Sequence, residues 1–197
     1  MSRIFNLDGT LMQRISQYFY SKSSFWVFLI TLALFVMFML VVLPAESDRS
    51  AQVTGSVKSP DTSFYYTKTE LYQMAEAYGQ EGRLYYLDSR ISFDIVWPLV
   101  YTFFLINSIS WILNKTILEE SKLRLLNLAP MAGILLDFLE NISNMVVMFR
   151  YPLRTDIIAS LAGIFTSLKW VFVGGSFLIL VFGVVLWVGV KTNIIKT

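Results

Sequence analysis

Long apolar runs alternate with polar segments four times along this chain of 197 residues. The runs cover residues 23–43, 91–113, 125–149 and 157–190. A helix of about 20 apolar residues is long enough to cross the hydrocarbon core of a bilayer. We therefore expect an all-α membrane protein in which four transmembrane helices form a bundle.

The segment that precedes the first run has the pattern of an amphipathic helix. Its apolar side chains recur on one helical face, at Leu11, Met12, Ile15, Tyr18 and Phe19. Thr10 and Gln13 have the spacing of a capping box, so residues 1–22 are predicted to include a cytoplasmic helix on the membrane surface. The first run is too long for a cleaved signal peptide, and we expect it to remain as an anchor that ends before Pro44.

Residues 44–90 form the long extramembrane segment, which we expect outside the membrane bundle. Its first half is rich in Ser, Thr, Lys and Asp and is predicted to be a solvated loop with a short strand at 63–66. Thr67 and Glu70 then offer another capping box. The apolar stripe that follows predicts an amphipathic helix at about 68–78, packed over the mouth of the bundle.

The fourth run is longer than a single crossing requires. Its roughly 34 residues would extend about 50 Å as a helix, whereas the hydrocarbon core is about 30 Å thick. The helix must therefore project, tilt or break. Lys169 and the pair Gly174 and Gly175 favour a break or an interfacial first half, with the span itself from about Ser167 to Val190.

The orientation of the chain follows from charges near the first span. Outside the predicted spans, eight basic residues fall on one side of the membrane and seven on the other, so the overall count does not decide the orientation. Lys22 lies close to the first span on one side, whereas Glu46 and Asp48 follow it on the other. Because basic residues favour the cytoplasmic side, we expect both termini in the cytoplasm of a cell or inner membrane.

Composition supports the membrane assignment and excludes several kinds of chemistry. The chain is 55% hydrophobic and 15% charged, and its net charge of +2 includes no extended basic run, so the bilayer is an expected partner and nucleic acid is not. The absence of Cys and His excludes thiol redox chemistry and Ser-His-Asp catalysis. Acid–base chemistry would have to use carboxylates, Lys or Tyr, and no particular cofactor or metal is indicated.

The third run carries polar residues on one helical face. Asp137, Glu140, Asn141 and Asn144 are spaced at i, i+3, i+4 and i+7. Ionisable side chains are expensive in hydrocarbon, so this face should point into the bundle and mark a functional site.

Residues of the other spans are expected at similar depth. Helix rise places Asp94 and Tyr101 of the second span and Lys169 of the fourth near this face, with Arg83 and Arg90 above it. The predicted site is a polar, acidic cavity that opens outward and is lined by Asp94, Tyr101, Asp137, Glu140, Asn141, Asn144 and Lys169. Two carboxyls in such a site should not both ionise unless a base, metal or cationic ligand is present.

Three functions are compatible with these features. The first is binding of a small molecule, lipid headgroup or cation, alone or as a subunit of a transport or signalling assembly. The second is an enzyme that uses Asp137 and Glu140 on a lipidic substrate, which is less favoured because one helix presents both acids from the same side. The third is a structural subunit whose polar stripe fastens it to a membrane-protein partner.

Structural roles also stay open for the individual residues. Asn141 and Asn144 have the character of amides that join neighbouring membrane helices. Lys169 could instead be a lysine whose side chain extends to the membrane boundary. Arg90 and Asp94 could form an ordinary i, i+4 ion pair at the surface.

Overall fold

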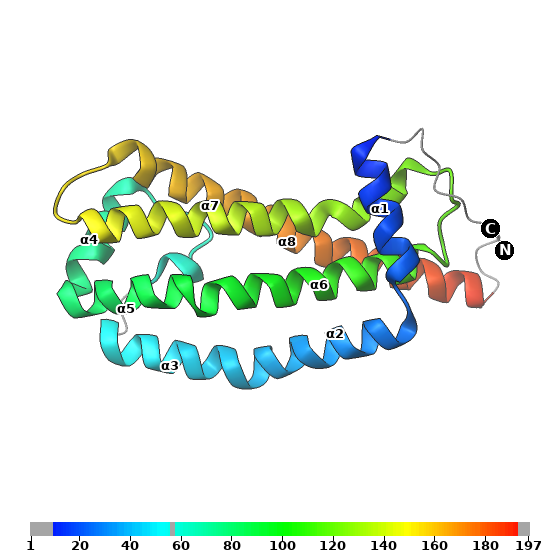
Figure 1. Cartoon of the computed structure of the whole chain (residues 1–197), viewed down its shortest axis with the longest axis horizontal. Coiled ribbons are helices and arrows are strands. Elements are labelled where there is room, and N and C mark those ends of the chain that lie inside the picture. The colour runs from blue at the N-terminus through cyan, green and yellow to red at the C-terminus, as the bar shows by residue number, and fades with distance from the viewer. Residues whose placement is uncertain (1–9, 56–57, 193–197) are drawn as a thin grey trace.

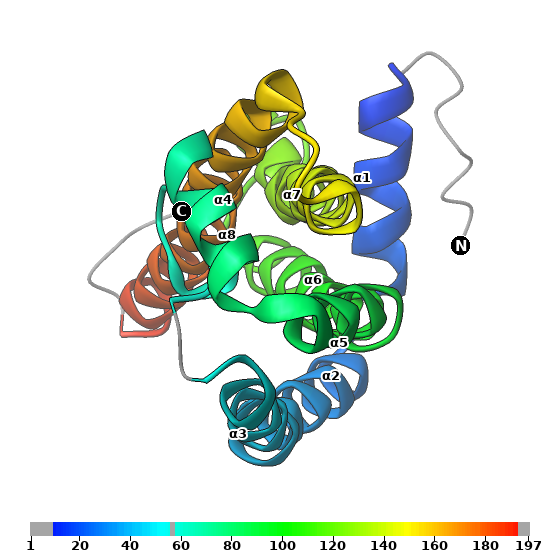
Figure 2. The same cartoon turned by 90° about the vertical axis from the view of Figure 1, so that its left-hand side faces the viewer.

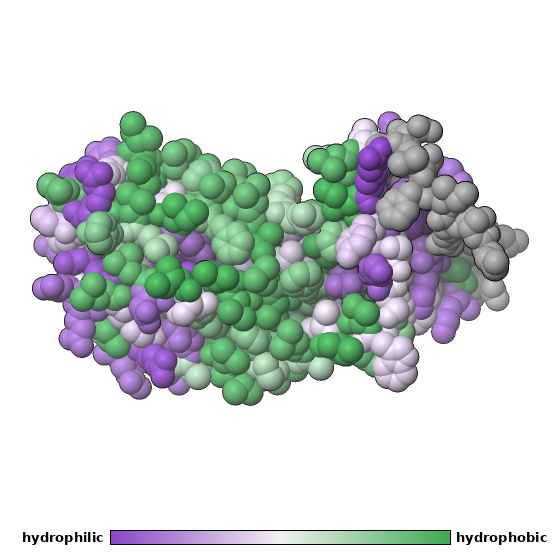
Figure 3. All heavy atoms as spheres, viewed as in Figure 1, coloured by the Kyte–Doolittle hydropathy of each residue, from purple (hydrophilic) through white to green (hydrophobic). Residues whose placement is uncertain are grey.

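The computed structural model describes residues 10–55 and 58–192, which form helices and contain no strand. Four stretches are long and apolar enough to cross a membrane: Phe25–Thr54, Gly79–Leu113, Lys122–Arg150 and Asp156–Lys191. They run along the long axis of the molecule (Figure 1), and an apolar belt separates two more polar ends (Figure 3). The predicted all-helical fold is confirmed for the described residues, and its four long apolar helices indicate an integral membrane protein.

The first span is continuous through its proline. It consists of α2 (Phe25–Met37), a π-helical turn η1 (Phe38–Val42) and α3 (Leu43–Thr54), which ends at Gly55 with φ 72°. The prediction that the helix ends before Pro44 is wrong, and the loop predicted to follow is helical as far as Thr54. The wider π turn relieves the clash that a proline ring makes with the preceding turn. This span packs along the second span at the edge of the bundle (Figure 2).

Residues 58–67, which we call the strap, lie against the membrane helices. They contain one 3₁₀ turn, η2 (Pro60–Thr62), and the strand predicted at 63–66 is absent from them. Instead of pairing with another strand, the backbone bonds to side chains of α8 (Asp156–Lys191). Trp170 Nε1 donates to the Ser63 carbonyl at 3.1 Å, and Ser167 Oγ donates to the Phe64 carbonyl at 3.0 Å.

Two further helices connect the strap to the second span. The first, α4 (Lys68–Ala77), begins with a capping box of Thr67 and Glu70 and buries the side chains of Leu71 and Met74. After it, α5 (Gly79–Ile91) starts at Gly79 with φ 62° and leads through Ser92 into α6 (Phe93–Leu113). We predicted no helix at α5, which carries Arg90 to the site described below.

The third and fourth spans pack closely together. A 3₁₀ segment, η3 (Lys122–Leu128), leads into α7 (Ala129–Arg150), which lies against α8 over much of its length. The predicted break at Gly174 and Gly175 is wrong, because α8 is one helix of 36 residues that crosses the bundle obliquely (Figure 2). A glycine weakens a helix by only about 1 kcal/mol and does not by itself end it.

The end of the molecule opposite α4 is crossed by α1 (Leu11–Lys22), which lies across the spans (Figure 1). Neutral hydrogen bonds hold it there. Ser16 Oγ donates to Asn127 Oδ1 at 2.8 Å, and Asn127 Nδ2 donates to Ser110 Oγ at 3.0 Å. The C-terminal end of α8 lies at this same end, which we call the α1 end; the other is the strap end. Residues 1–9 of the predicted surface segment lie outside the described residues.

Candidate functional site

The polar face of α7 points into the protein. Glu140 and Asn144 are fully buried, and Asp137 and Asn141 are nearly so. These side chains face α6, α8 and the strap. Polar partners within the protein therefore offset the free-energy cost of placing these groups inside a membrane.

Lys169 of α8 contacts both acidic side chains of this face. Its Nζ lies 2.6 Å from Glu140 Oε2 and 3.5 Å from Asp137 Oδ1, and all three side chains are buried. Tyr101 of α6 donates its hydroxyl to Asp137 Oδ2 at 2.7 Å. Lys169 and Tyr101 therefore lie beside the acids, as the sequence analysis predicted. We call Asp137, Glu140 and Lys169 the inner unit.

The strap contributes a tyrosine that the sequence analysis did not select. Tyr66 is fully buried, and its hydroxyl donates to Asn144 Oδ1 at 3.0 Å and lies 3.3 Å from Glu140 Oε1. Burial and the neighbouring Glu140 raise the pKa of Tyr66, which keeps it a neutral donor. Its backbone fits because α8 has Gly163 there: a Cβ at that position would lie 2.0 Å from the Tyr66 carbonyl oxygen.

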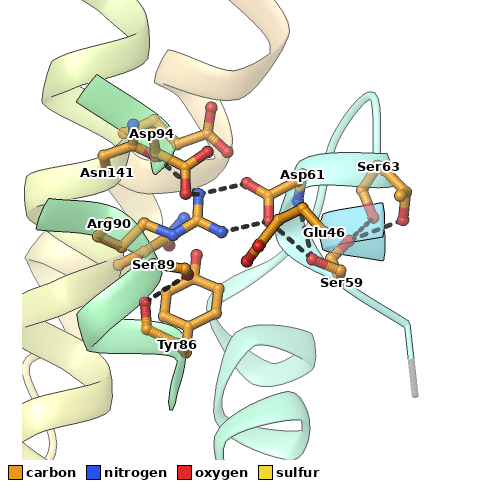
Figure 4. Close-up of polar contacts among 12 residues, drawn as sticks. Glu46, Ser59, Asp61, Ser63, Tyr86, Ser89, Arg90, Asp94 and Asn141 are labelled. Atoms are coloured by element: carbon orange, nitrogen blue, oxygen red, sulfur yellow. Dashed lines mark hydrogen bonds and ion pairs between the residues drawn. The ribbon is translucent and has the colours of Figure 1, made fainter. Parts of the chain in front are cut away.

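A second unit surrounds the buried guanidinium of Arg90. Asp61 of the strap binds it with both oxygens, at 2.6 Å to one nitrogen and 2.5 Å to the other (Figure 4). Asp94 of α6 lies 3.2 Å from the same guanidinium. The ring of Tyr86 lies against it, with 4.1 Å between the guanidinium carbon and the ring centroid. We call Asp61, Asp94 and Arg90 the outer unit.

Asn141 joins the two units. Its Oδ1 accepts a hydrogen bond from Arg90 at 3.1 Å, and its Nδ2 donates to Asp137 Oδ1 at 3.4 Å. The inner and outer units therefore form one continuous network, which we call the charge network. It is built from α5, α6, α7, α8 and the strap.

Asp61 was also missed by the sequence analysis, because its segment has the composition of a solvated loop. Burial by itself would raise the pKa of Asp61, but the Arg90 guanidinium holds it below the usual value. Ser59 Oγ adds a hydrogen bond to the same carboxylate at 2.9 Å. Asp61 is thus charged at neutral pH and fastens the strap to α5.

The charge network contains more acids than bases. It has four carboxyl groups, at Asp61, Asp94, Asp137 and Glu140, and two basic groups, at Arg90 and Lys169. If all six groups were ionised, two negative charges would remain uncompensated. A low-dielectric environment strongly opposes that state, so it favours uptake of a proton or another cation.

Several buried donors in and beside the network have no hydrogen-bond partner within the described part of the chain. They are Asn144 Nδ2, Arg90 Nε and the Tyr86 hydroxyl. Among the described residues, no group of three or more acidic side chains is arranged as a metal site. The carboxyls instead contact Lys, Arg and Tyr side chains individually.

Arg83 does not belong to the network. Its NH1 donates to the Ala75 carbonyl at 2.8 Å, and its guanidinium lies over the Tyr151 ring at 4.6 Å. The side chain bends toward α4 because that helix end offers a free carbonyl.

The predicted cavity is closed in this structure, because its lining residues contact one another and the strap covers them. Two surface depressions occur elsewhere. One of about 290 Å³ includes Tyr72 and Arg154, and another of about 460 Å³ lies between α5 and α7 and includes Leu87 and Phe149. Neither is lined by a residue of the charge network.

Comparison with known proteins adds no relative: no family model, curated protein or solved structure matches this chain.

Proposed function

We propose that this multi-pass membrane protein takes up protons or another small cation in its charge network, as a transport or signalling subunit. The observation that carries the proposal is the sharing of two buried bases by four carboxyl groups. Ionisable groups within membrane helices are expensive and commonly handle ions, protons or ligands.

The arrangement repeats one motif twice, which supports uptake at a defined place. In the inner unit, Lys169 stands between Asp137 and Glu140; in the outer unit, Arg90 stands between Asp61 and Asp94. Each base neutralises one of the two carboxylates in its unit, so one further positive charge would make each unit neutral. Asn141 connects the units and can pass a change in one to the other by turning its amide.

A proton is the ligand that best suits a closed site. A lipid headgroup or small molecule would have to displace Tyr66 and Asp61, whereas a proton needs only brief separation of the strap from the helices. Larger ligands remain alternatives that require the strap to leave.

We further propose that the strap end faces outward and that both termini are cytoplasmic, in a cell or inner membrane. Within the described residues, basic side chains at the α1 end outnumber acidic ones. The basic residues there are Arg14, Lys22, Lys115, Lys122, Arg124 and Lys191, and the acidic residues are Glu119 and Glu120. This asymmetry agrees with the preference of basic residues for the cytoplasmic side.

Infrared difference spectroscopy of the purified protein in nanodiscs tests the proposal. At neutral pH we expect a band from a protonated carboxyl group that Asp137→Asn or Glu140→Gln removes or shifts. Asp156→Asn is the matched control, since this carboxylate is exposed and paired with Lys68 and Arg154. The proposal fails if the wild-type protein has no such band and added monovalent or organic cations do not raise its unfolding temperature.

A role as an assembly subunit is the second candidate. It is favoured by the first span, whose most apolar window has no buried residue within the described part of the chain. A stoichiometric partner retained after mild detergent extraction would support it, and a lone monodisperse protein would oppose it. The enzyme alternative is not proposed, because Asp137 and Glu140 contact the same lysine and neither faces an open cleft.

A further inference from the structure

At the α1 end, two lysines and two tryptophans meet where α6 and α8 end. Lys115 Nζ lies 3.6 Å from the ring centroid of Trp111 and 5.3 Å from that of Trp187. Lys191 Nζ approaches Trp187 to 4.6 Å. Both ammonium groups therefore adjoin the same indole ring, and we call these four residues the basic–aromatic cluster.

No carboxylate of the described residues neutralises the positive charge of this cluster. Both lysine side chains are exposed, and within the described residues neither forms an ion pair with Asp or Glu. Helix C-termini attract lysines, but this attraction alone does not bring two ammonium groups from different helices to one ring. Contact with an indole face leaves the N–H donors of each ammonium available to an anion.

The cluster is held in place by its neighbours. Trp111 stacks on Phe28 of α2, with 5.2 Å between the ring centroids and an interplanar angle of 8°. The two indoles of the cluster lie 6.2 Å apart. Trp26 is 72% exposed at the beginning of α2. Tryptophans at the end of a membrane span commonly lie at the level of the lipid headgroups.

We infer that the basic–aromatic cluster binds the phosphate group of an anionic phospholipid. Lys115 and Lys191 would bind the phosphate, while the acyl chains lie along the exposed apolar face of α8 at Val184 and Val188. Val184 lies three residues before Trp187 and Lys191 four residues after it. At this helical spacing, the contacts to the headgroup and to the acyl chains lie on one face of α8. A lipid source is favoured over free phosphate because exposed apolar side chains of α8 continue up to this end, at Val181, Val184, Val185 and Val188. This inference is independent of the charge network.

The test uses full-length protein in nanodiscs of phosphatidylcholine that contain a minor fraction of brominated phosphatidylglycerol. Bromine quenches tryptophan fluorescence on contact, and we expect stronger quenching than with brominated phosphatidylcholine at the same fraction. Lys115→Gln/Lys191→Gln should weaken this preference about 25-fold, from roughly fivefold for each lysine near a charged lipid surface. Lys58→Gln/Lys68→Gln, at the strap end and in ion pairs there, should leave it unchanged.

Trp187→Phe identifies the responding ring, since most of the lipid-specific quenching should disappear with it. The inference is overturned if the two lipids quench equally, if the double variant at the α1 end retains the preference, or if the strap-end variant loses it. Millimolar inorganic phosphate that abolishes the preference at constant ionic strength would assign the cluster to a soluble anion and overturn the lipid assignment.

Discussion

The strap half and the α1 half of the same helix bundle are held together by different interactions. The strap half joins six ionisable side chains in one network, and four of them, Arg90, Asp137, Glu140 and Lys169, are buried. The α1 half uses stacked rings, such as Phe35 on Phe104 at 4.6 Å, and neutral hydrogen bonds around Asn127. Both halves join segments that are far apart in the sequence, so long-range packing by itself does not require buried charge.

This difference helps to distinguish buried charges that stabilise the fold from buried charges that have a function. Replacing a buried ion pair with apolar groups is often neutral or stabilising, whereas removing one partner is costly. The α1 half fastens a peripheral element, α1, with hydrogen bonds of amide and hydroxyl groups and with the Arg124 guanidinium, which lies 3.9 Å from the ring centroid of Tyr20. The strap is instead fastened through the groups that would take up charge, and this connection supports the proposed role of the network.

The largest effect is expected when the inner unit loses its base. Lys169→Met leaves Asp137 and Glu140 buried without their cation, and we expect the free energy of unfolding to fall by about 3–5 kcal/mol. Unfolding in mixed micelles, followed by tryptophan fluorescence, measures it. Lys169→Met/Glu140→Gln should recover part of the loss, because one carboxylate is removed with the lysine. A single variant as stable as the wild type would mean that the network carries little charge.

A smaller effect is expected from crowding the strap. In Gly163→Ala the new methyl group would overlap the Tyr66 carbonyl, so we expect a loss of about 1–3 kcal/mol and faster hydrogen exchange in the strap. The matched control is Gly175→Ala on the same helix, where nothing lies within 4 Å of the added Cβ. The control should exchange like the wild type. Equal exchange in both variants would contradict the close docking of the strap.

The α1 half should respond locally to loss of its amide. Asn127→Ala removes the hydrogen bonds to Ser16 and Ser110, and we expect a loss of about 1 kcal/mol, near the net value of neutral hydrogen bonds. Hydrogen exchange should increase in α1 and stay unchanged in the strap. If the strap responds as well, the two halves are coupled and the comparison drawn above does not hold.

The smallest effect concerns pH. Because the pKa of Asp61 is lowered in the folded protein, its contribution is fully present above the unfolded value of about 4 and is lost as the pH falls through the folded pKa. The Asp61 side chain is 36% exposed, so we expect less than about 1 kcal/mol. Relative to the intrinsic exchange rate at each pH, the protection of the strap amides should be constant from about pH 8 to 5 and decrease below about 4. Asp61→Asn should remove this decrease, and an unchanged profile would rule out Asp61 as its source.

Much of the polar face could be predicted from the sequence, and its partners only in part. Helical spacing and the expense of charge in hydrocarbon selected Asp137 and Glu140 and predicted an inward-facing stripe. Helix rise brought Lys169 and Tyr101 to the same depth. Rise gives the level of a residue but not the direction of a long side chain, and the Arg83 guanidinium turns to Ala75 and Tyr151 instead of joining the network.

The strap residues were beyond this kind of reasoning. Tyr66 contacts residues 74 and 78 positions away, and Asp61 contacts one 29 positions away, in a segment predicted to be a solvated loop with a short strand. The nearest local signal was the aromatic run Phe64, Tyr65 and Tyr66 in an otherwise polar stretch. Composition averages over such a stretch and hides the single side chain that is buried.

The sequence by itself determined that four helices can cross a membrane and that the third carries an acidic face, because apolar length and helical period are local properties. Only the tertiary structure decided which base each acid contacts and that a strap closes over them. Those pairings depend on how close two backbones can come, and at Gly163 the absence of one methyl group permits the contact that positions Tyr66 against Glu140.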